Sequence, residues 1–253
     1  MKIDSNEQLR QEHSPDEIKK RLNQPLKSQV VSDAVLGGID GCVTTFAVVS
    51  STIGAGLPSY VALIMGFANL ISDGFSMAIS SFESIKAESE YVEKIRLSEE
   101  EHIDKVPDGE REEIRQIFEN KGFRGETLEK IVETISSDRK LWVDTMMKEE
   151  HGIQSTTSNP WHSAIITFLA FIIVGSVPLI PFLISSLDIH QAFLLSIAFA
   201  GVMFFSIGAI KGYIFSKWII FSGLKTLVTG GGAAGLAYLA GYILKHTFGI
   251  DGA

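Results

Sequence analysis

Residues 60–101, YVALIMGFANLISDGFSMAISSFESIKAESEYVEKIRLSEEE, are apolar in their first half and charged in their second half. The stretch 60–82 is long enough to cross a bilayer, because a helix needs about 20 mostly apolar residues to span the hydrocarbon core. From Ser84 to about Glu101 the helical pattern continues in residues that favour water. The stretch therefore predicts one long helix that begins in a membrane and ends outside it.

The long helix leads into a strongly acidic block, residues 83–160. This block holds 20 of the 30 acidic residues but only 12 of the 22 Lys and Arg, so it accounts for the net charge of −8. Its periodic apolar residues predict short helices over 109–120, 126–136 and 138–151 that pack as a small bundle. Clustered carboxylates attract cations and repel phosphates, which excludes nucleic acid as an expected partner.

Further apolar stretches complete the predicted architecture. The expected spans cover residues 34–56, 60–82, 162–185, 191–213 and 224–246. We expect an all-α membrane protein with five transmembrane helices and a helical domain inserted between spans two and three. The expected divisions are 1–32 for an N-terminal segment, 33–85 for spans one and two, 86–160 for the inserted domain, and 161–253 for spans three to five. Pro178 and Pro181 are expected to kink span three or loosen its last turn.

The basic residues predict the orientation. Six Lys and Arg precede the first span and twelve lie in the acidic block, whereas only Lys245 lies near the opposite ends of the spans. Cytoplasmic segments carry the excess of Lys and Arg, so we expect the N-terminus and the inserted domain to be cytoplasmic. The N-terminal residues lack the apolar region of a cleavable signal peptide. Their short length favours a bacterial inner membrane over a vacuolar membrane.

Span one carries Asp40 inside its apolar stretch. A carboxylate at membrane depth is costly unless it is protonated, paired or bound to a cation, so Asp40 is a candidate pathway residue. The alternative is an interfacial Asp that accepts hydrogen bonds from glycine amides. Asp33 lies on the same helix face near the membrane boundary, where it fits equally well as a helix cap. Cys42 has no partner, which excludes a disulfide framework and a thiolate metal site.

Span two carries a polar stripe. Its members on one helix face, at i, i+4 and i+8, are Asn69, Asp73 and Met77, with Ser72, Ser76 and Ser80 beside them. Such a stripe lines a transport pathway or makes hydrogen bonds between helices. Burial favours the protonated acid, whereas a bound divalent cation favours the carboxylate, so Asp40 and Asp73 can exchange a proton for a metal ion.

Candidate metal ligands recur at helical spacing in the acidic block. Glu99 and His102 are three apart, as are Glu110 and Glu113, and Met146 and Met147 precede Glu150 by four and three residues. Carboxylate, imidazole and thioether groups together suit first-row transition metals better than Mg²⁺ or Ca²⁺. The alternative is that the acids face water and the methionines belong to the core. Glu99 and His102 also match a Glu-x-x-His motif, but a di-iron bundle needs that motif twice, which disfavours a ferritin-like oxidase.

Six segments of the chain resemble the vacuolar iron transporter family. They are DAVLGGIDGCVTTFAVV (33–49), GFANLISDGFSMAISSFESIKAESE (66–90), VPDGEREEI (106–114), WVDTMMKEE (142–150), SAIITFLAFIIVGSVPLIPF (163–182) and GGGAAGLAYLAGYIL (230–244). The resemblance implies a five-span homodimer with a pathway between the subunits and a cytoplasmic metal-binding domain. It also implies transport of Fe²⁺, and often of Mn²⁺ and other divalent ions, out of the cytosol in exchange for protons.

The resemblance assigns roles by position. It implies Asp40 and Met77 as pathway residues, and as cytoplasmic metal ligands Glu99, Glu110, Glu113, Met146, Met147 and Glu150. Asn69 and His102 depart from the pattern, since glutamate is usual at both positions. His102 can still ligate a transition metal and tilt the ion preference. Asn69 cannot titrate, so we expect the proton-coupling role one turn along at Asp73, where the family commonly has a small residue.

These observations together predict a proton-coupled exporter of Fe²⁺ that is not an enzyme and holds no prosthetic group. Mn²⁺, Co²⁺, Ni²⁺ and Zn²⁺ are further candidate substrates, and protons, the lipid bilayer and a second copy of the chain are the expected partners. Two alternatives remain open. One is a metal-binding membrane sensor or buffer that does not transport, and the other is a related transporter that prefers an ion other than iron.

Overall fold

The computed structural model describes residues 10, 13–22, 28–153, 159–215 and 218–249, and within these ranges every regular element is helical. The elements in chain order are α2 (Pro15–Leu22), α3 (Ser28–Gly54), α4 (Ser59–Lys105), α5 (Pro107–Asn120), α6 (Gly125–Ser137), α7 (Arg139–Glu149), α8 (Pro160–Ser176), the 3₁₀ helix η1 (Val177–Leu183), α9 (Ile189–Ile214) and α10 (Ile219–Phe248). Much of the expected N-terminal segment 1–32 lies outside the described residues. The short helix α2 within that segment was not predicted.

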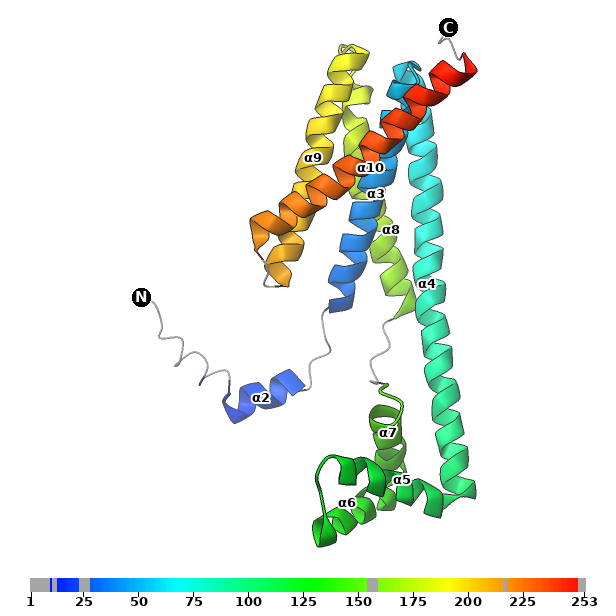
Figure 1. Cartoon of the computed structure of the whole chain (residues 1–253), viewed down its shortest axis with the longest axis vertical. Helices are drawn as coiled ribbons and strands as arrows, with labels where there is room; N and C mark the ends of the chain where they lie inside the picture. The colour runs from blue at the N-terminus through cyan, green and yellow to red at the C-terminus, as the bar shows by residue number, and fades with distance from the viewer. Residues whose placement is uncertain (1–9, 11–12, 23–27, 154–158, 216–217, 250–253) are drawn as a thin grey trace.

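Five helical segments are long and apolar enough to cross a membrane, namely those in α3, α4, α8 with η1, α9 and α10. They form the bundle in the upper half of Figure 1, where α3 packs against α8, α10 and α4, and α9 packs against α10. Their outward faces are rich in large apolar side chains, as a lipid-facing surface requires. The five-span prediction is therefore confirmed.

Glycines bring α3 and α8 into backbone contact. A Cβ atom on Gly37 would lie 2.4 Å from the Thr167 carbonyl oxygen, and one on Gly41 would lie 2.5 Å from that of Phe171. From the other helix, a Cβ on Gly175 would lie 2.7 Å from the carbonyl oxygen of Gly41. Real Cβ atoms do not approach backbone so closely, so only glycine fits at this crossing. The contact fixes α3, which carries Asp40, against the rest of the bundle.

The end of span three is loosened where its prolines predicted a change. The α-helix stops at Ser176 and continues as η1, which contains Pro178 and Pro181. A proline has no N–H to donate, so carbonyl groups in the preceding turn lose their helical partners. The Pro178 carbonyl is satisfied instead by the Ser196 hydroxyl of α9, which donates to it at 2.7 Å.

Helix α4 runs beyond the membrane bundle to Lys105, and α5, α6 and α7 gather at its far end (Figure 1). We call the last turns of α4 together with α5–α7 the inserted bundle. Its core is closed by nine buried side chains: Ile103, Ile114, Leu128, Val132, Ile135, Trp142, Val143, Met146 and Met147. The predicted short helices are present with ends that differ by a few residues. Local signals set these ends, because Pro107 opens α5, Gly122 at φ 99° follows it, and Asp138 caps α7.

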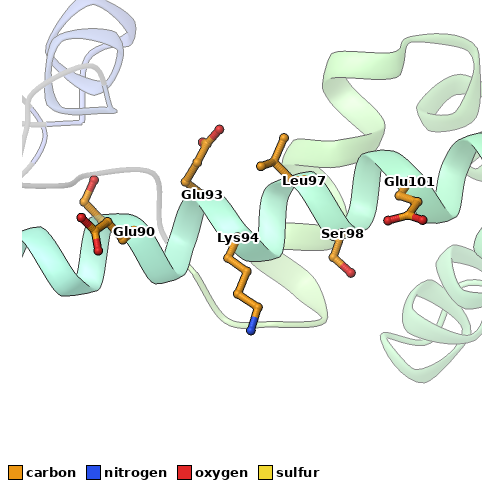
Figure 2. Close-up of a pocket in the computed structure, with 7 residues that line it drawn as sticks. Glu90, Glu93, Lys94, Leu97, Ser98 and Glu101 are labelled. Carbon is orange, nitrogen blue, oxygen red and sulfur yellow. The ribbon is translucent and has the colours of Figure 1, made fainter.

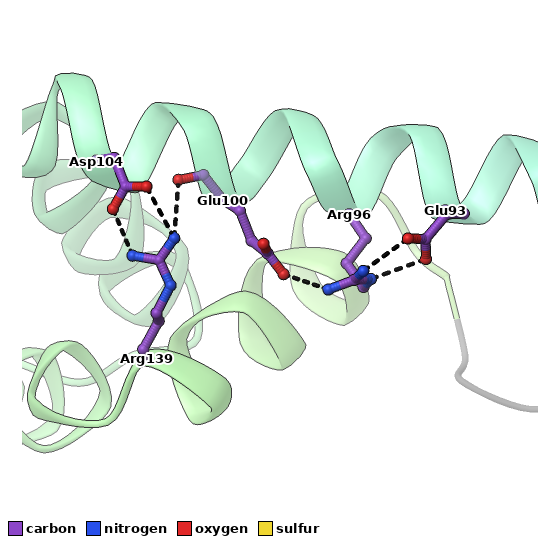
Figure 3. A network of polar contacts seen from close by, with 5 residues as sticks. All are labelled: Glu93, Arg96, Glu100, Asp104 and Arg139. Carbon is purple, nitrogen blue, oxygen red and sulfur yellow. Dashed lines mark hydrogen bonds and ion pairs between the residues drawn. The ribbon is translucent and has the colours of Figure 1, made fainter.

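Arginine bridges join α7 to α4 and link residues along α4 itself. Arg139, the first residue of α7, donates to both carboxylate oxygens of Asp104, one of them at 2.9 Å (Figure 3). Arg96 on α4 bonds to Glu93 at 2.9 Å and also to Glu100. Each exposed pair contributes at most about 1 kcal/mol, so the apolar core does most of the holding. These arginines also neutralise three acids next to the site described below.

Candidate functional site

Two glutamates are buried side by side where α4 ends and α5 begins. Glu99 lies near the end of α4 and Glu110 in the first turn of α5, and the turn at Val106 folds one helix back against the other. Each side chain is only 3% exposed. Within the described residues, Oε2 of Glu99 and Oε2 of Glu110 have no hydrogen-bond partner. Burying unpaired carboxylate oxygens is unfavourable unless a proton or a cation joins them.

The basic residues of the block pair with other acids. Arginines neutralise Glu93, Glu100 and Asp104, as Figure 3 shows. In the part of the chain that the structure describes, no Lys or Arg forms an ion pair with any of four acids: Glu99, Glu110, Glu113 and Glu150. These four, with His102, are called the acidic cluster below. Its negative charge is left for another cation to balance.

Histidines approach the buried carboxylates. Nδ1 of His102 lies 3.5 Å from Glu110 Oε1 and 4.0 Å from Glu99 Oε1. Nε2 of His151 lies 3.0 Å from the same Glu99 oxygen and 3.7 Å from Glu150 Oε2. Two groups of three potential ligands result, Glu99 with His102 and Glu110, and Glu99 with Glu150 and His151. The ligand atoms in each group lie within 4.8 Å of one another, a separation that one metal ion can bridge.

Burial and mutual repulsion change the acidity of the cluster. Burial, the largest cause, and the charges of Glu113 and Glu99 together raise the pKa of Glu110 to about 7, while His102 acts in the opposite sense. The pKa of Glu150 is also raised, chiefly by burial, with Glu113 and Glu99 adding to the effect of burial and His151 opposing it. A bound divalent cation would favour the ionised form of both groups, so metal binding there releases protons.

The structure brings most of the predicted ligands together. Glu113 is exposed on α5, yet its charge acts on both Glu110 and Glu150. Met146 and Met147 are 0% and 6% exposed and pack in the core of the inserted bundle. This placement matches the alternative interpretation, in which the two methionines belong to the core. Met146 and Met147 lie one helical turn before Glu150, so their packing also positions Glu150 beside the other residues of the acidic cluster.

His151 was not predicted. Helical spacing identifies ligands three or four residues apart on one face, but His151 follows Glu150 directly, where α7 has ended. The turn at this point directs both side chains toward Glu99. The signal available in the sequence was a histidine adjacent to a predicted ligand at a helix end.

The predicted pathway residues lie on α3 and α4 within the membrane bundle. Asp40 and Asp73 come from these two different helices, and the charge of Asp73 acts on Asp40. Both are half-buried, and the amide nitrogen of Asn69 is buried with no hydrogen-bond partner among the described residues. Asn69, Asp73 and Met77 are thus partly covered by the bundle, whereas Ser72, Ser76 and Ser80 beside them are exposed.

A cavity of about 410 Å³ opens between α3, α4 and α8, and Met77 lines it. Asp33 lies at its edge, buried, and accepts a hydrogen bond from the Ser163 hydroxyl. Ser81 and Ser163 are joined by a hydrogen bond of 3.0 Å. Asp33 lies inside α3, which begins at Ser28, so its interpretation as a helix cap is wrong.

One continuous helix, α4, carries residues of both the acidic cluster and the predicted pathway. Glu99 and Met77 both belong to α4, and a rise of 1.5 Å per residue places them roughly 33 Å apart along its axis. Figure 1 shows the inserted bundle at one end of α4 and the membrane bundle around its other end. A rigid helix therefore holds the two sites at a fixed distance.

Comparison with known proteins places the chain in a family. The VIT family model matches residues 31–242. Vacuolar iron transporter 2 from Oryza sativa subsp. japonica is 30% identical over 212 residues, covering 83% of this chain and 85% of that protein. Vacuolar iron transporter 1 from Tulipa gesneriana is 29% identical over 235 residues, or 92% of each chain. The vacuolar iron transporter of Toxoplasma gondii is 29% identical over 233 residues, covering 88% of this chain and 77% of its own.

These matches run through the membrane helices and the inserted bundle alike. They confirm the resemblance that the sequence motifs carried, and they agree with the five membrane-spanning helices of the structure. The relatives are named as iron transporters, which is consistent with a chain that is not an enzyme. The chain is an integral membrane protein that belongs to the VIT family of vacuolar iron transporters.

Proposed function

We propose that this protein is a proton-coupled transporter that moves Fe²⁺ out of the cytosol, with Mn²⁺, Co²⁺, Ni²⁺ and Zn²⁺ as further possible substrates. The observation that carries the proposal is the pair Glu99 and Glu110, which are buried with no Lys or Arg partner among the described residues, where α4, the helix that also carries Asp73 and Met77, ends. Metal-ion transport follows from the family, and the iron substrate is suggested by the names of the relatives.

The acidic cluster serves as the capture site. Its carboxylates concentrate cations near the membrane, and the imidazole of His102 adds a nitrogen ligand suited to transition metals. Because the pKa of Glu110 is raised to about 7, its carboxyl group is still partly protonated near neutral pH. A metal ion that binds there displaces this proton. Capture and translocation are then separate steps, performed about 33 Å apart along α4.

Translocation uses the acids inside the membrane bundle. Asp40 and Asp73 accept the metal as carboxylates and release it when protons from the far side neutralise them. Met77, at the cavity between α3, α4 and α8, provides a soft thioether on the way. Because Asn69 cannot titrate, Asp73 takes the coupling role. Asp73→Asn should abolish the dependence of metal uptake on the proton gradient, and unchanged dependence would refute this assignment.

The orientation follows from the basic residues. Most of the Lys and Arg residues of the chain lie in the inserted bundle or before α3, and few lie at the opposite ends of the spans. This distribution supports a cytosolic location for both segments. Metal captured on the cytosolic side is released on the opposite side of the membrane. The link between α3 and α4 and the link between η1 and α9 lie on that side. Either a bacterial inner membrane or a vacuolar membrane provides the required inward proton gradient.

A homodimer with the pathway between its subunits completes the proposal. One face of α4 beyond the membrane carries an open hollow of about 650 Å³ lined by residues of α4 alone, shown in Figure 2. Leu97 on this face is 53% exposed, and Tyr91 nearby is 60% exposed. Large apolar side chains on a charged, water-facing helix support the packing of a second copy there.

A transport assay across several metals tests the proposal against its alternatives. The purified chain is reconstituted in vesicles with an acidic lumen, and uptake of Fe²⁺, Mn²⁺, Co²⁺, Ni²⁺ and Zn²⁺ is measured separately. Proton-driven uptake with Fe²⁺ among the preferred ions supports the proposal. Metal binding without uptake of any ion would identify a sensor or buffer, and uptake that excludes Fe²⁺ would identify a transporter of another metal.

A further inference from the structure

His151 lies against the acidic cluster but has no part in the capture site described so far. It follows the last residues of α7, and its backbone N–H donates to the Met146 carbonyl at 3.4 Å. This bond turns the chain so that the side chain, 28% exposed, points back toward α4. Its Nε2 reaches Glu99 Oε1 at 3.0 Å and Glu150 Oε2 at 3.7 Å.

Glu99 is the residue on which the two histidines converge. His102 approaches its Oε1 from α4, and His151 approaches the same oxygen from the segment after α7. The other oxygen, Oε2, is buried and has no partner among the described residues. If His151 served only to balance the buried charge, a single ion pair would suffice. A carboxylate that has one oxygen shared by two imidazoles and the other without a partner instead offers ligand atoms for an ion.

We propose that His151 is a metal ligand that acts with Glu99 and Glu150 and shifts the ion preference of the acidic cluster toward ions that bind imidazole well. The three ligand atoms, one each from Glu99, Glu150 and His151, lie within 4.8 Å of one another. Imidazole favours Co²⁺, Ni²⁺ and Zn²⁺ over Mn²⁺, for which carboxylates are good ligands. The inference rests on the proposed function only in taking the acidic cluster as a metal site.

The rival role for His151 is structural, as an ion-pair partner that holds Glu99 in place. His151→Gln separates the two roles, because glutamine keeps a hydrogen-bonding group but removes the imidazole. His190→Gln is the matched control, since His190 is exposed at the start of α9, a helix of the membrane bundle and not of the inserted bundle. Thermal unfolding in the presence of a chelator checks that each variant is folded.

The experiment titrates the full-length chain in detergent with Co²⁺ and, separately, with Mn²⁺, following heat and the visible absorption of bound Co²⁺. For His151→Gln we expect the Co²⁺ affinity to fall by about tenfold or more, the scale on which groups around a metal site act. The Mn²⁺ affinity should change by less than about threefold, because its carboxylate ligands remain. The visible spectrum of bound Co²⁺ should also change as a nitrogen ligand is lost.

Equal losses for both ions, or no loss for either, would overturn the proposal and leave His151 as an ion-pair partner. An equal loss of Co²⁺ affinity in His190→Gln would overturn it as well. The measurement does not depend on transport. A chain that shows the expected change in ion preference but moves no metal would refute the proposed function alone, and proton-driven transport with an unchanged preference would refute this inference alone.

Discussion

The carboxyl group of Glu110 holds its proton unusually tightly, with a pKa of about 7, because burial and the neighbouring Glu113 and Glu99 disfavour its charge. In the unfolded chain the same group titrates near 4.3. Between these pH values the native state keeps a proton that the unfolded state has lost. The contribution of Glu110 to stability therefore falls as the pH rises from about 4.3 to about 7.

Glu110→Gln should accordingly stabilise the metal-free protein at pH 8, on the order of 1 to 3 kcal/mol, because it removes a buried charge. At pH 4.5 the native group is protonated and resembles glutamine, so the difference should nearly vanish. Thermal unfolding in detergent with a chelator, at both pH values, measures the effect. The same variant should bind metal more weakly.

Glu112→Gln is the control on the same helix. The pKa of Glu112 is lowered by its hydrogen bonds from Gln116 and Arg115, so its stabilising contribution is present at pH 8 and is lost on acidification. This variant should be slightly less stable than the native chain at pH 8. Destabilisation of Glu110→Gln at pH 8 would show that the buried carboxylate is not a source of instability in the metal-free state.

Sequence reasoning identified the cluster residues that lie inside helices. Glu99 and His102 share one turn of α4, and Glu110 shares a face of α5 with Glu113, so regular spacing was informative. The approach of Glu99 to Glu110 depends on the turn at Val106, which spacing does not describe. His151 was missed for the same reason, because its position depends on how the chain leaves α7.

At the scale of the elements, the crossing of α3 and α8 depends on glycine. Gly41→Ala would place a methyl group 2.5 Å from the Phe171 carbonyl oxygen, so the helices would have to separate. We expect a loss of about 1 to 3 kcal/mol in stability, as in other overpacked interiors, and reduced transport because Asp40 is displaced. Thermal unfolding and metal uptake of the variant measure both effects.

Gly231→Ala on α10 is the matched control. A Cβ atom there meets nothing within 4 Å, and alanine favours helix over glycine by about 0.5–1 kcal/mol. Its stability should equal or slightly exceed that of the native chain. Similar losses in the two variants would mean that the close approach of α3 and α8 is not what limits stability.

In the proposed mechanism helix α4 joins the capture step to the translocation step, and the need for its continuity is testable outside the membrane. Ala87 is exposed between the two bundles. Ala87→Pro removes a helical hydrogen bond, kinks the helix and costs about 3 kcal/mol locally. We expect metal binding by the acidic cluster to persist while uptake at low metal concentration falls severalfold. Ala87→Ser keeps the helix and should leave both unchanged.

A proline variant with normal uptake would contradict the account, because the position of the inserted bundle would then not matter.

The existence of α4 could be predicted from the switch between apolar and charged residues at its middle. Its packing could not, since the contacts of α3 with α8 and α10 join residues far apart in the chain. Helix α2 escaped prediction because it has only eight residues and most of them are charged, so it does not stand out from a polar segment.

At the scale of the whole molecule, charge and apolar surface are separated along one axis. Among the described residues, acids without a Lys or Arg partner gather at one end of α4, and the membrane bundle surrounds the other end. This separation could be predicted from the distribution of charged residues along the sequence, because 20 of the 30 acidic residues fall in one block. It places part of the acidic cluster on the same helix as Asp73, which lies in the membrane bundle.

The central claim is that metal moves through the membrane bundle in exchange for protons and depends on Asp40. The most direct measurement is anaerobic Fe²⁺ uptake into vesicles with an acidic lumen, with lumenal pH recorded, for the native chain and for Asp40→Asn. The account predicts uptake by the native chain, with a matching loss of lumenal protons, that requires the pH gradient and is lost in Asp40→Asn. Uptake that persists in Asp40→Asn, or that proceeds equally without a gradient, would contradict it.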